Sequence, residues 1–571
     1  MSTYSHHILP FPEPSPAPSA PRAVLEIEDL TIAFPGAPEP VVRNASLSVA
    51  ERQIVAIVGE SGSGKTLTSL SAVGLLPPSA RIGGRVRVGG VDVIGAEEQV
   101  LRKLRGGTVG MIFQEPMTSL NPVMKIGRQI AEVVELHGGL DRQQVRPRVI
   151  ELLDAVGITR PSLVANQYPH ELSGGMKQRI MIGMALAGRP RLLIADEPTT
   201  ALDATIQVQV LELILKVARD LDASVLLVTH DFGLVAEVAD DVVVMNRGEV
   251  VERAGVFDIF RRPRHSYTRH LLDSLPRIDN GPEPVAAVPS GETAAPPLLK
   301  VEGLSKTYRS KANWLAPAES TVALADIDLR LEEGRTLGIV GESGSGKSTL
   351  GHLIAGLVAP DAGSIVYEGA PVRPSAVAQR SAFRANVQFM FQDPYSSLNP
   401  RMTVRDIVTE PLIVQHLIAP RETADRAADL LQQVGLPTHF GDRLPHELSG
   451  GQRQRVGLAR AISTHPKLVI CDEPVSALDV SVQTQILKLL KKLQEDQGIA
   501  YIFIAHGLEG VHFMSNDIAV MRHGKIVEYG PRYQVFNDPQ HPYTRRLLSA
   551  MMVPDPERSR FRGAADGRRA I

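Results

Sequence analysis

The chain carries the same set of short motifs twice, in the same order. GESGSGK stands at Gly59–Lys65 and again at Gly341–Lys347. LSGG stands at Leu172–Gly175 and again at Leu448–Gly451, 276 residues later (448 − 172). Later motifs keep this offset. The period is far longer than that of solenoid repeats, so it predicts two copies of one whole domain.

Shifts in composition mark where the two copies begin and end. Residues 278–297 are rich in Pro, Ala, Gly and Glu, which is typical of a linker. We therefore expect one domain at 22–277 and a second at 298–551. Residues 1–21, rich in Pro and Ser, are expected to be a disordered tail. Residues 552–571 form a basic tail, for which a solvated, disordered end is favoured over contact with anionic lipid.

The overall composition excludes several classes of protein. The 571 residues include 61 Lys plus Arg against 63 Asp plus Glu, a net charge of −2, whereas nucleic-acid-binding chains are usually basic. The single cysteine, Cys471, excludes an internal disulfide and a cysteine-rich zinc or iron–sulfur site. No apolar run approaches the roughly 18 residues that span a bilayer. Work at a membrane would therefore need separate subunits.

Short, continuous apolar runs alternate with helical stretches in both copies. Ile54–Val58 ends in a Gly-rich turn, Leu192–Ala195 ends in two acids, and Val225–Val228 ends in Thr-His. The second copy repeats this order. Such runs suit buried, mainly parallel strands. We expect an α/β fold with functional residues at the carboxyl ends of strands.

The two GESGSGK segments fit the phosphate-loop pattern G-x-x-x-x-G-K-[ST], each after an apolar strand and before a helix. Glycines let the backbone approach phosphates, and backbone N–H groups at the helix start face the anion. The lysines are expected to reach the β and γ phosphates, and Thr66 and Ser348 to bind Mg²⁺. The residues assigned to the loops are Gly59, Glu60, Ser61, Gly62, Ser63, Gly64, Lys65, Thr66, Gly341, Glu342, Ser343, Gly344, Ser345, Gly346, Lys347 and Ser348.

Paired acids follow an apolar strand in each copy. Asp196 and Asp472 end their strands and are expected to hold Mg²⁺, directly or through water. Glu197 and Glu473 come next and are expected to polarise the attacking water as general bases. An Asp-Glu pair alone would be an ordinary strand end, but the repeat and the upstream loops favour the catalytic interpretation.

Two further side chains in each copy are expected at the nucleotide. His230 and His506 stand 33 residues after their glutamates (230 − 197 and 506 − 473), just past the next apolar strand. We expect each to contact the γ-phosphate. Gln114 and Gln392 end apolar runs and are expected to sense the nucleotide or its metal.

In both copies, LSGG is followed by a basic and polar run, LSGGMKQR at Leu172–Arg179 and LSGGQRQR at Leu448–Arg455. Together with the loops and acids, this resembles the ATP-binding subunits of ABC transporters, since general P-loop ATPases lack the signature. The resemblance covers both copies nearly end to end. It implies two tandem P-loop ATPase domains, each with a mainly parallel core sheet, an antiparallel β subdomain and a helical signature subdomain.

The resemblance also implies a head-to-tail pair in which each ATP lies between the two copies. The loop of the first copy would be closed by Ser449, Gly450, Gly451 and Gln452. The loop of the second would be closed by Ser173, Gly174, Gly175 and Met176. Ala201–Asp203 and Ala477–Asp479 match the family's D-loop. Phe34 and Tyr308 stand where an aromatic ring stacks on adenine, although ordinary strand packing would also explain them.

Longer stretches are similar to the oligopeptide/dipeptide permease branch of importers. They are QEPMTSLNPVM at Gln114–Met124, QDPYSSLNPRM at Gln392–Met402, RHSYT at Arg264–Thr268 and HPYT at His541–Thr544. The branch implies ATP-driven import of peptides or related small solutes. Its partners would be two transmembrane permease subunits and an extracytoplasmic solute-binding protein. The chain would lie peripherally at the cytoplasmic face of the inner (cell) membrane. The S/P-Y-T segments are explained equally well as packing at the end of each domain.

Three departures from the family pattern bear on function. Met176 replaces the usual Gln in the first signature, and Gly507 follows His506 where an acid, as at Asp231, is usual. The C-terminal cysteine cluster that binds an iron–sulfur centre in some members cannot form, because Cys471 is alone. Both copies nevertheless keep the Lys, Asp, Glu and His, so two hydrolytic sites are expected, with ATP and Mg²⁺ as ligands.

The alternative is a soluble twin-ABC ATPase that acts on ribosomes or nucleic acid. Such factors usually join their domains through a long, charged, helical linker. The Pro-rich linker of about 20 residues and the near-neutral charge favour the importer.

Overall fold

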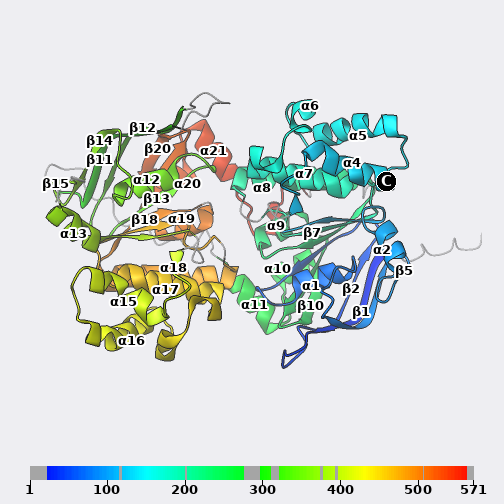
Figure 1. Ribbon diagram of the computed structural model, residues 1–571, viewed down its shortest axis with the longest axis horizontal. Coiled ribbons are helices and arrows are strands. Elements are labelled where there is room, and N and C mark those ends of the chain that lie inside the picture. Colours follow the sequence, from blue (N-terminus) through cyan, green and yellow to red (C-terminus); the bar gives the residue numbers. More distant parts are fainter. Residues whose placement is uncertain are drawn as a thin grey trace, which may run out of the picture.

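Each half of the chain folds into the same three parts. The computed structural model describes residues 22–114, 119–199, 202–275, 296–309, 320–372, 377–392, 397–476, 478–505 and 507–561. Each half has a six-stranded core sheet, a four-stranded antiparallel sheet and a group of helices. The halves lie side by side in Figure 1, with the first at the right and the second at the left. This confirms the tandem α/β fold expected from the repeat.

The core sheet of each half is parallel except for one edge strand. In the first half its order is β10-β9-β3-β8-β7-β6 and in the second it is β16-β17-β18-β13-β19-β20. The pairs β9–β10 and β19–β20 are antiparallel, and the other pairings are parallel. The strands are β3 (Ile54–Val58), β6 (Val109–Ile112), β7 (Leu192–Asp196), β8 (Ser224–Val228), β9 (Asp241–Asn246), β10 (Glu249–Gly255), β13 (Thr336–Val340), β16 (Val387–Met390), β17 (Leu468–Asp472), β18 (Ala500–Ile504), β19 (Asp517–Arg522) and β20 (Lys525–Pro531).

The central strands of these sheets are apolar on both faces, and every residue of β7, β8, β13, β17 and β18 is buried. Helices or the antiparallel sheet cover both faces, which is why the sequence shows continuous apolar runs rather than alternation. The carboxyl ends of parallel strands meet at one edge of the sheet. The phosphate loops and the paired acids are therefore brought together there.

An antiparallel sheet packs beside the core of each half. Its strand order is β2-β1-β4-β5 in the first half and β12-β11-β14-β15 in the second. Its long strands show alternating burial that suits a sheet with one covered face. The strands are β1 (Ala23–Ala33), β2 (Val42–Ala50), β4 (Arg81–Val88), β5 (Val91–Asp92), β11 (Leu299–Arg309), β12 (Ser320–Leu331), β14 (Ala362–Tyr367) and β15 (Ala370–Pro371).

Helices form the third part of each half, and their apolar stripes explain why they pack. In α4 (Ile126–His137), Ile126, Ile130 and Val134 recur every fourth residue and are fully buried. The other principal helices are α1 (Lys65–Ser71), α5 (Arg142–Ala155), α7 (Gly174–Leu186), α8 (Ala204–Asp220), α9 (Phe232–Val238), α10 (Val256–Arg261), α11 (Ser266–Asp273), α12 (Lys347–Ile354), α15 (Val404–Val414), α16 (Thr423–Gln433), α17 (Gly450–Ile462), α18 (Val480–Gln497), α19 (Leu508–Met514), α20 (Arg532–Asn537) and α21 (Pro542–Ser549).

The two halves are arranged in opposite directions. In Figure 1 the helices α4, α5 and α7 lie at the top of the first half, whereas α15, α16 and α17 lie at the bottom of the second. Helix α21 contacts α8 of the first half, and Thr484 Oγ1 on α18 donates to Ser274 O just after α11, at 2.5 Å. The last helix of each half therefore lies at the seam between the halves.

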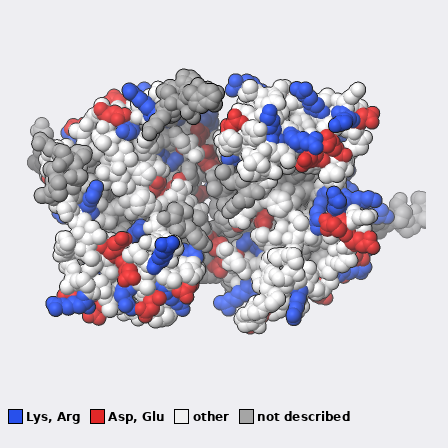
Figure 2. Space-filling view, in the orientation of Figure 1, with Lys and Arg blue, Asp and Glu red and all other residues white. Residues whose placement is uncertain are grey.

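Charged side chains of both signs occur over both halves on the face of the molecule shown in Figure 2. On the face shown in Figure 2, Lys and Arg alternate with Asp and Glu among the described residues of both halves. Among the residues that the structure describes, no helix is long and apolar enough to cross a bilayer.

The segment after α21 crosses back onto the first half, and we call Met551–Phe561 the C-terminal strap. Met552 and Phe561 pack against the apolar core of the first half. Arg560 donates from its backbone N (2.8 Å) and its Nε (3.1 Å) to the carboxylate of Glu237 on α9, which is only 3% exposed. Ser559 Oγ donates to the carbonyl of the same Glu237. The solvated end expected from composition is therefore wrong for residues 552–561, and residues 562–571 lie outside the described part of the chain.

Removal of the Arg560 side chain is expected to destabilise the first half. In Arg560→Ala the buried Glu237 carboxylate keeps a backbone donor but loses a charged one. Hydrogen bonds to charged groups contribute about 1.5–3 kcal/mol, so we expect a loss of about 2 kcal/mol in the free energy of unfolding. Urea denaturation measures this loss in the free energy of unfolding. Arg558→Ala, on an exposed side chain of the same strap, is the control, and equal effects of the two changes would contradict this role of Arg560.

Candidate active sites

Each phosphate loop joins a buried core strand to a helix that begins at its lysine. Lys65 is the first residue of α1, and Gly64 before it has φ of 96°. Lys65 Nζ donates to Gly59 O (2.8 Å) and Glu60 O (2.9 Å), and Lys347 Nζ makes the matching bonds to Gly341 O and Glu342 O (2.7 and 2.9 Å). The loops thus curl around their lysines. Burial lowers the pKa of both lysines, although nearby carboxylates oppose this.

Three observations indicate that the loops can bind a phosphate group. The hydroxyls of Ser63 and Ser345 are buried, and no partner for them occurs among the described residues. A side chain added at Gly62 or Gly344 would meet nothing within 4 Å, so these backbone positions border open space. Both have positive φ, 75° and 77°, which turns consecutive N–H groups toward one side. The lysine ammonium completes a cradle for an anion.

The hydroxyl after each lysine faces the aspartate at the end of the next strand but one in the core sheet, β7 or β17. Thr66 Oγ1 lies 3.4 Å from Asp196 Oδ1, and Ser348 Oγ lies 3.2 Å from Asp472 Oδ1. Burial raises the pKa of Asp196 to about 6 and raises that of Asp472. The described residues contain no cluster of three or more His, Cys, Asp or Glu able to hold a metal. One hydroxyl and one carboxylate suit Mg²⁺, which takes its other ligands from phosphates and water.

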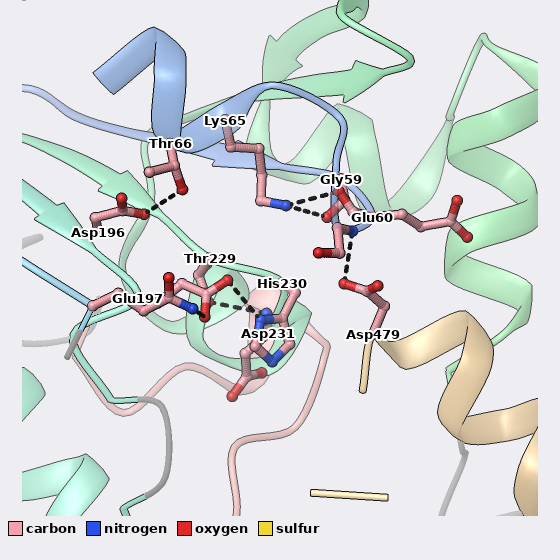
Figure 3. A network of polar contacts seen from close by, with 12 residues as sticks. Gly59, Glu60, Lys65, Thr66, Asp196, Glu197, Thr229, His230, Asp231 and Asp479 are labelled. Carbon is pink, nitrogen blue, oxygen red and sulfur yellow. Dashed lines mark hydrogen bonds and ion pairs between the residues drawn. The ribbon is translucent and has the colours of Figure 1, made fainter. Parts of the chain in front are cut away.

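In the first half, Glu197 is held between two side chains from other elements. Gln114 Nε2, just past β6, donates to Glu197 Oε2 at 2.8 Å, and His230 Nδ1 lies 3.1 Å from Glu197 Oε1. Figure 3 shows His230 and Glu197 together beside the loop. Burial would lower the pKa of His230, but the hydrogen bond and charge of Glu197 outweigh it and raise that pKa. The φ of Glu197, 46°, is uncommon for a residue with a side chain and is kept where a site requires it.

The second half repeats this arrangement as far as the structure describes it. Gln392 Nε2 donates to Glu473 Oε2 at 2.6 Å, and Glu473 has φ of 50°. His506 lies outside the described residues. Gly507, which follows it, stands at the N-cap of α19 and has no side chain to cap the helix, whereas Asp231 caps α9 by accepting from Leu234 N at 3.1 Å. The departure at Gly507 therefore removes a helix cap next to the second site.

Carboxylates cross between the halves in both directions. Asp479, before α18 of the second half, accepts from Ser61 N of the first loop at 2.8 Å. Asp203, before α8 of the first half, accepts from Ser343 N of the second loop at 3.4 Å. Figure 3 shows Asp479 reaching the first loop next to Glu60, whose carboxylate also accepts from Ser481 Oγ. Each loop thus contacts the opposite half. Ala201 and Ala477 of the D-loop segments lie outside the described residues.

The signature residues sit at the starts of helices. Ser173 caps α7 by accepting from Met176 N (3.4 Å), and Ser449 caps α17 by accepting from Gln452 N (3.3 Å). Gln452 Oε1 also accepts from Ser449 N at 2.9 Å, a reciprocal bond that methionine at 176 cannot make. Gly174, Gly175, Gly450 and Gly451 form the first turns of these helices. Contact of the signatures with the opposite nucleotide stays a prediction.

The two aromatic residues expected at adenine have different surroundings. Phe34, just after β1, is partly buried and packs against the core of the first half. Tyr308, near the end of β11, is 43% exposed, and Lys306 Nζ lies 5.8 Å from its ring centroid. Tyr308 is therefore the more accessible of the two rings, whereas Phe34 has a packing role as well.

A contact that the sequence did not reveal joins each loop to the C-terminal end of its own half. Tyr267 Oη on α11 accepts from Glu60 N at 3.3 Å, and Tyr543 Oη on α21 accepts from Glu342 N at 3.0 Å. Only the repetition of the Y-T pair hinted that these tyrosines matter. Their contact with a loop about 200 residues away could not be read from the sequence.

Comparisons with known proteins match both halves. The family model described as ABC transporter matches residues 42–200 and 324–476, and the one described as oligopeptide/dipeptide transporter, C-terminal region, matches 251–298 and 527–570. The chain is 45% identical to the glutathione import ATP-binding protein GsiA of Pectobacterium atrosepticum and 44% identical to that of Escherichia coli K12. Each match covers 94% of this chain and 91% of the relative.

A dimeric bacterial ABC transporter cassette of known structure is 30% identical, with a TM-score of 0.37, and the match covers 41% of this chain and 98% of the cassette. The family models and the full-length relatives agree with the duplicated loops, signatures and paired acids found above. The chain belongs to the ATP-binding proteins of ABC transporters, in their oligopeptide/dipeptide branch, and is an ABC-type ATPase.

Proposed function

We propose that this chain hydrolyses ATP at two sites formed between its halves and so powers import of a peptide-like solute through separate membrane subunits. The crossing of Asp479 to the first loop and of Asp203 to the second carries the proposal. Because each loop already contacts the opposite half, nucleotide bound at a loop is linked to the distance between the halves. A single chain supplies both partners of the pair.

The residues of the first site divide the work by position. Lys65 and the loop N–H groups would bind the β and γ phosphates, and the Thr66 hydroxyl with the Asp196 carboxylate would hold Mg²⁺, which would supply positive charge beside the phosphates. Glu197 orients and polarises the attacking water, and Gln114 and His230 hold its carboxylate in place. In the second site the same roles are assigned to Lys347, Ser348, Asp472, Glu473 and Gln392.

Closing of each site is assigned to the opposite half. The signature serine and glycines of one half would face the phosphates bound at the loop of the other, with their N–H groups at the start of α7 or α17. Hydrolysis removes the γ-phosphate contacts and lets the halves separate. The alternation between closed and separated halves is the movement that the chain transmits to its partner subunits.

The cargo and partners are proposed from the relatives. GsiA proteins are named for glutathione import, and the match to the oligopeptide/dipeptide C-terminal region fits a short peptide or similar solute. We propose two transmembrane permease subunits, a solute-binding protein outside the membrane, and a peripheral location at the cytoplasmic face. The comparisons described above give no support to action on ribosomes.

Uptake in the native host tests this proposal. A strain lacking the chain is expected to lose uptake of labelled glutathione or di- and tripeptides, and the wild-type chain to restore it. The Glu197→Gln/Glu473→Gln variant is expected to accumulate normally but not to restore uptake. Affinity purification in mild detergent should recover two polytopic membrane proteins with the chain. Recovery of ribosomes instead, with uptake of these solutes unchanged in the deletion strain, would refute it.

A further inference from the structure

The last helix of each half lies against the phosphate loop of that half. On α11, Tyr267 Oη accepts from Glu60 N, and on α21, Tyr543 Oη accepts from Glu342 N. The two helices that make these bonds differ in sequence around the tyrosine, SYTRHLLD in α11 and PYTRRLLS in α21. Burial raises the pKa of Tyr267 to about 12 and raises that of Tyr543, so both hydroxyls stay protonated. The same contact in both halves argues against an accident of packing.

Each tyrosine is held in place by the start of its own helix. In the first half the Glu252 carboxylate accepts from Arg264 N (2.7 Å) and His265 N (3.0 Å), and His265 Nδ1 accepts from Tyr267 N (3.2 Å). The second half builds the same turn with its own residues: Glu528, Gln540, His541 and Tyr543. A carboxylate and an imidazole thus fix the backbone from which each ring extends.

The residue whose backbone N–H the tyrosine binds is one of the two whose carbonyls hold the loop lysine. Glu60 O accepts from Lys65 Nζ at 2.9 Å and from Ser63 N at 3.2 Å, and Glu342 O accepts equivalently from Lys347 Nζ at 2.9 Å. A hydrogen bond at Glu60 N limits rotation of this residue. It therefore helps to keep the adjacent N–H groups and the lysine in the shape that receives phosphate.

The same helices also touch the opposite half. Ser274 O, just after α11, accepts from Thr484 Oγ1 on α18, the helix that follows Asp479. In the second half, α21 contacts α8, the helix that follows Asp203. Each C-terminal helix therefore contacts both the loop of its own half and the D-loop helix that reaches that loop from across the seam.

We propose that Tyr267 and Tyr543 are positioning residues of the two nucleotide sites, which hold their phosphate loops in the shape that binds phosphate. The proposal rests on the proposed binding of ATP at both loops. It gives the C-terminal helix of each half a defined task in the reaction. The tyrosines act through the loop backbone and do not touch the reacting atoms.

The test compares tyrosine with phenylalanine, which keeps the ring and its packing and removes only the hydroxyl. The double variant Tyr267→Phe/Tyr543→Phe is expected to raise the Kd for ADP, measured by calorimetry, and the KM for ATP by about 2- to 12-fold, the range for one hydrogen bond. We expect kcat and the melting temperature to stay near the wild-type values. Tyr529→Phe is the control, because its hydroxyl donates to Arg330 O, outside the loops.

The outcomes separate the two proposals. An unchanged Kd and KM in the double variant, with wild-type ADP binding intact, would overturn the positioning role alone. A lower melting temperature and a lower kcat at unchanged KM would show that the hydroxyls only stabilise the fold, and would also overturn it. If the wild-type chain failed to bind ADP at all, the proposed two-site function itself would fail.

Discussion

Replacement of Glu197 and Glu473 together by Gln is expected to lower ATP turnover by at least about 100-fold, since a general base typically contributes a factor of 10²–10⁴. Glutamine has the shape of glutamate but cannot accept a proton. The double variant should therefore still bind ATP and hold the halves together. Each single variant should lose at least half of the activity, because each removes one of two sites. Release of inorganic phosphate under saturating ATP measures it.

The two single variants distinguish two active sites from one. If one change abolishes turnover and the other leaves the wild-type rate, the claim that both sites hydrolyse ATP is wrong. If each single change abolishes turnover, the two sites hydrolyse ATP only when both are intact. Glu28→Gln, on an exposed position of the antiparallel sheet, is the matched control and should leave the rate unchanged.

Replacement of Lys65 and Lys347 by Ala is expected to weaken nucleotide binding by about 100-fold or more. Lys65 and Lys347 are nearly buried, 6% and 5% exposed, and their ammonium groups donate to carbonyls of their own loops. Two charge-assisted hydrogen bonds to phosphate oxygens contribute about 1.5–3 kcal/mol each, and 1.4 kcal/mol corresponds to a tenfold change in affinity. The buried carboxylates nearby would also face the phosphates without a compensating cation.

Equilibrium titration with ADP checks this second prediction. Lys216→Ala, at an exposed position on α8, is the control and should bind as the wild type does. Each single variant should keep tight ADP binding at the loop whose lysine is unchanged. Binding of ADP to the double variant with wild-type affinity would contradict the assignment of the loops as the phosphate sites.

The arrangement of each half was predictable because its signals are local. A Gly-rich turn between an apolar strand and a helix, and two acids at the end of another parallel strand, lie at the same edge of the sheet. The structure brings Thr66 to Asp196, and Gln114 and His230 to Glu197, as that logic requires. The family resemblance identified the D-loop segments that end in Asp203 and Asp479, but it did not predict that these aspartates contact the opposite loops.

The remaining features depend on packing between distant segments, and periodicity carries no information about it. Tyr267 meets Glu60 only because α11 packs beside the loop of its own half. The C-terminal strap reads as a basic, solvated tail, since nothing in its composition shows that Glu237 is buried on the other half. The different surroundings of Phe34 and Tyr308 are equally invisible in the sequence.

The C-terminal strap turns the linear chain into a ring. The linker joins the first half to the second, and the strap leads from the second half back to Glu237 on α9 of the first, the helix that follows His230. Because the linker and the C-terminal strap both connect the halves, the halves come together again within one chain. Their effective concentration therefore does not depend on how much protein the cell contains. After ATP hydrolysis the halves would then swing apart as a hinged pair rather than exchange with other copies.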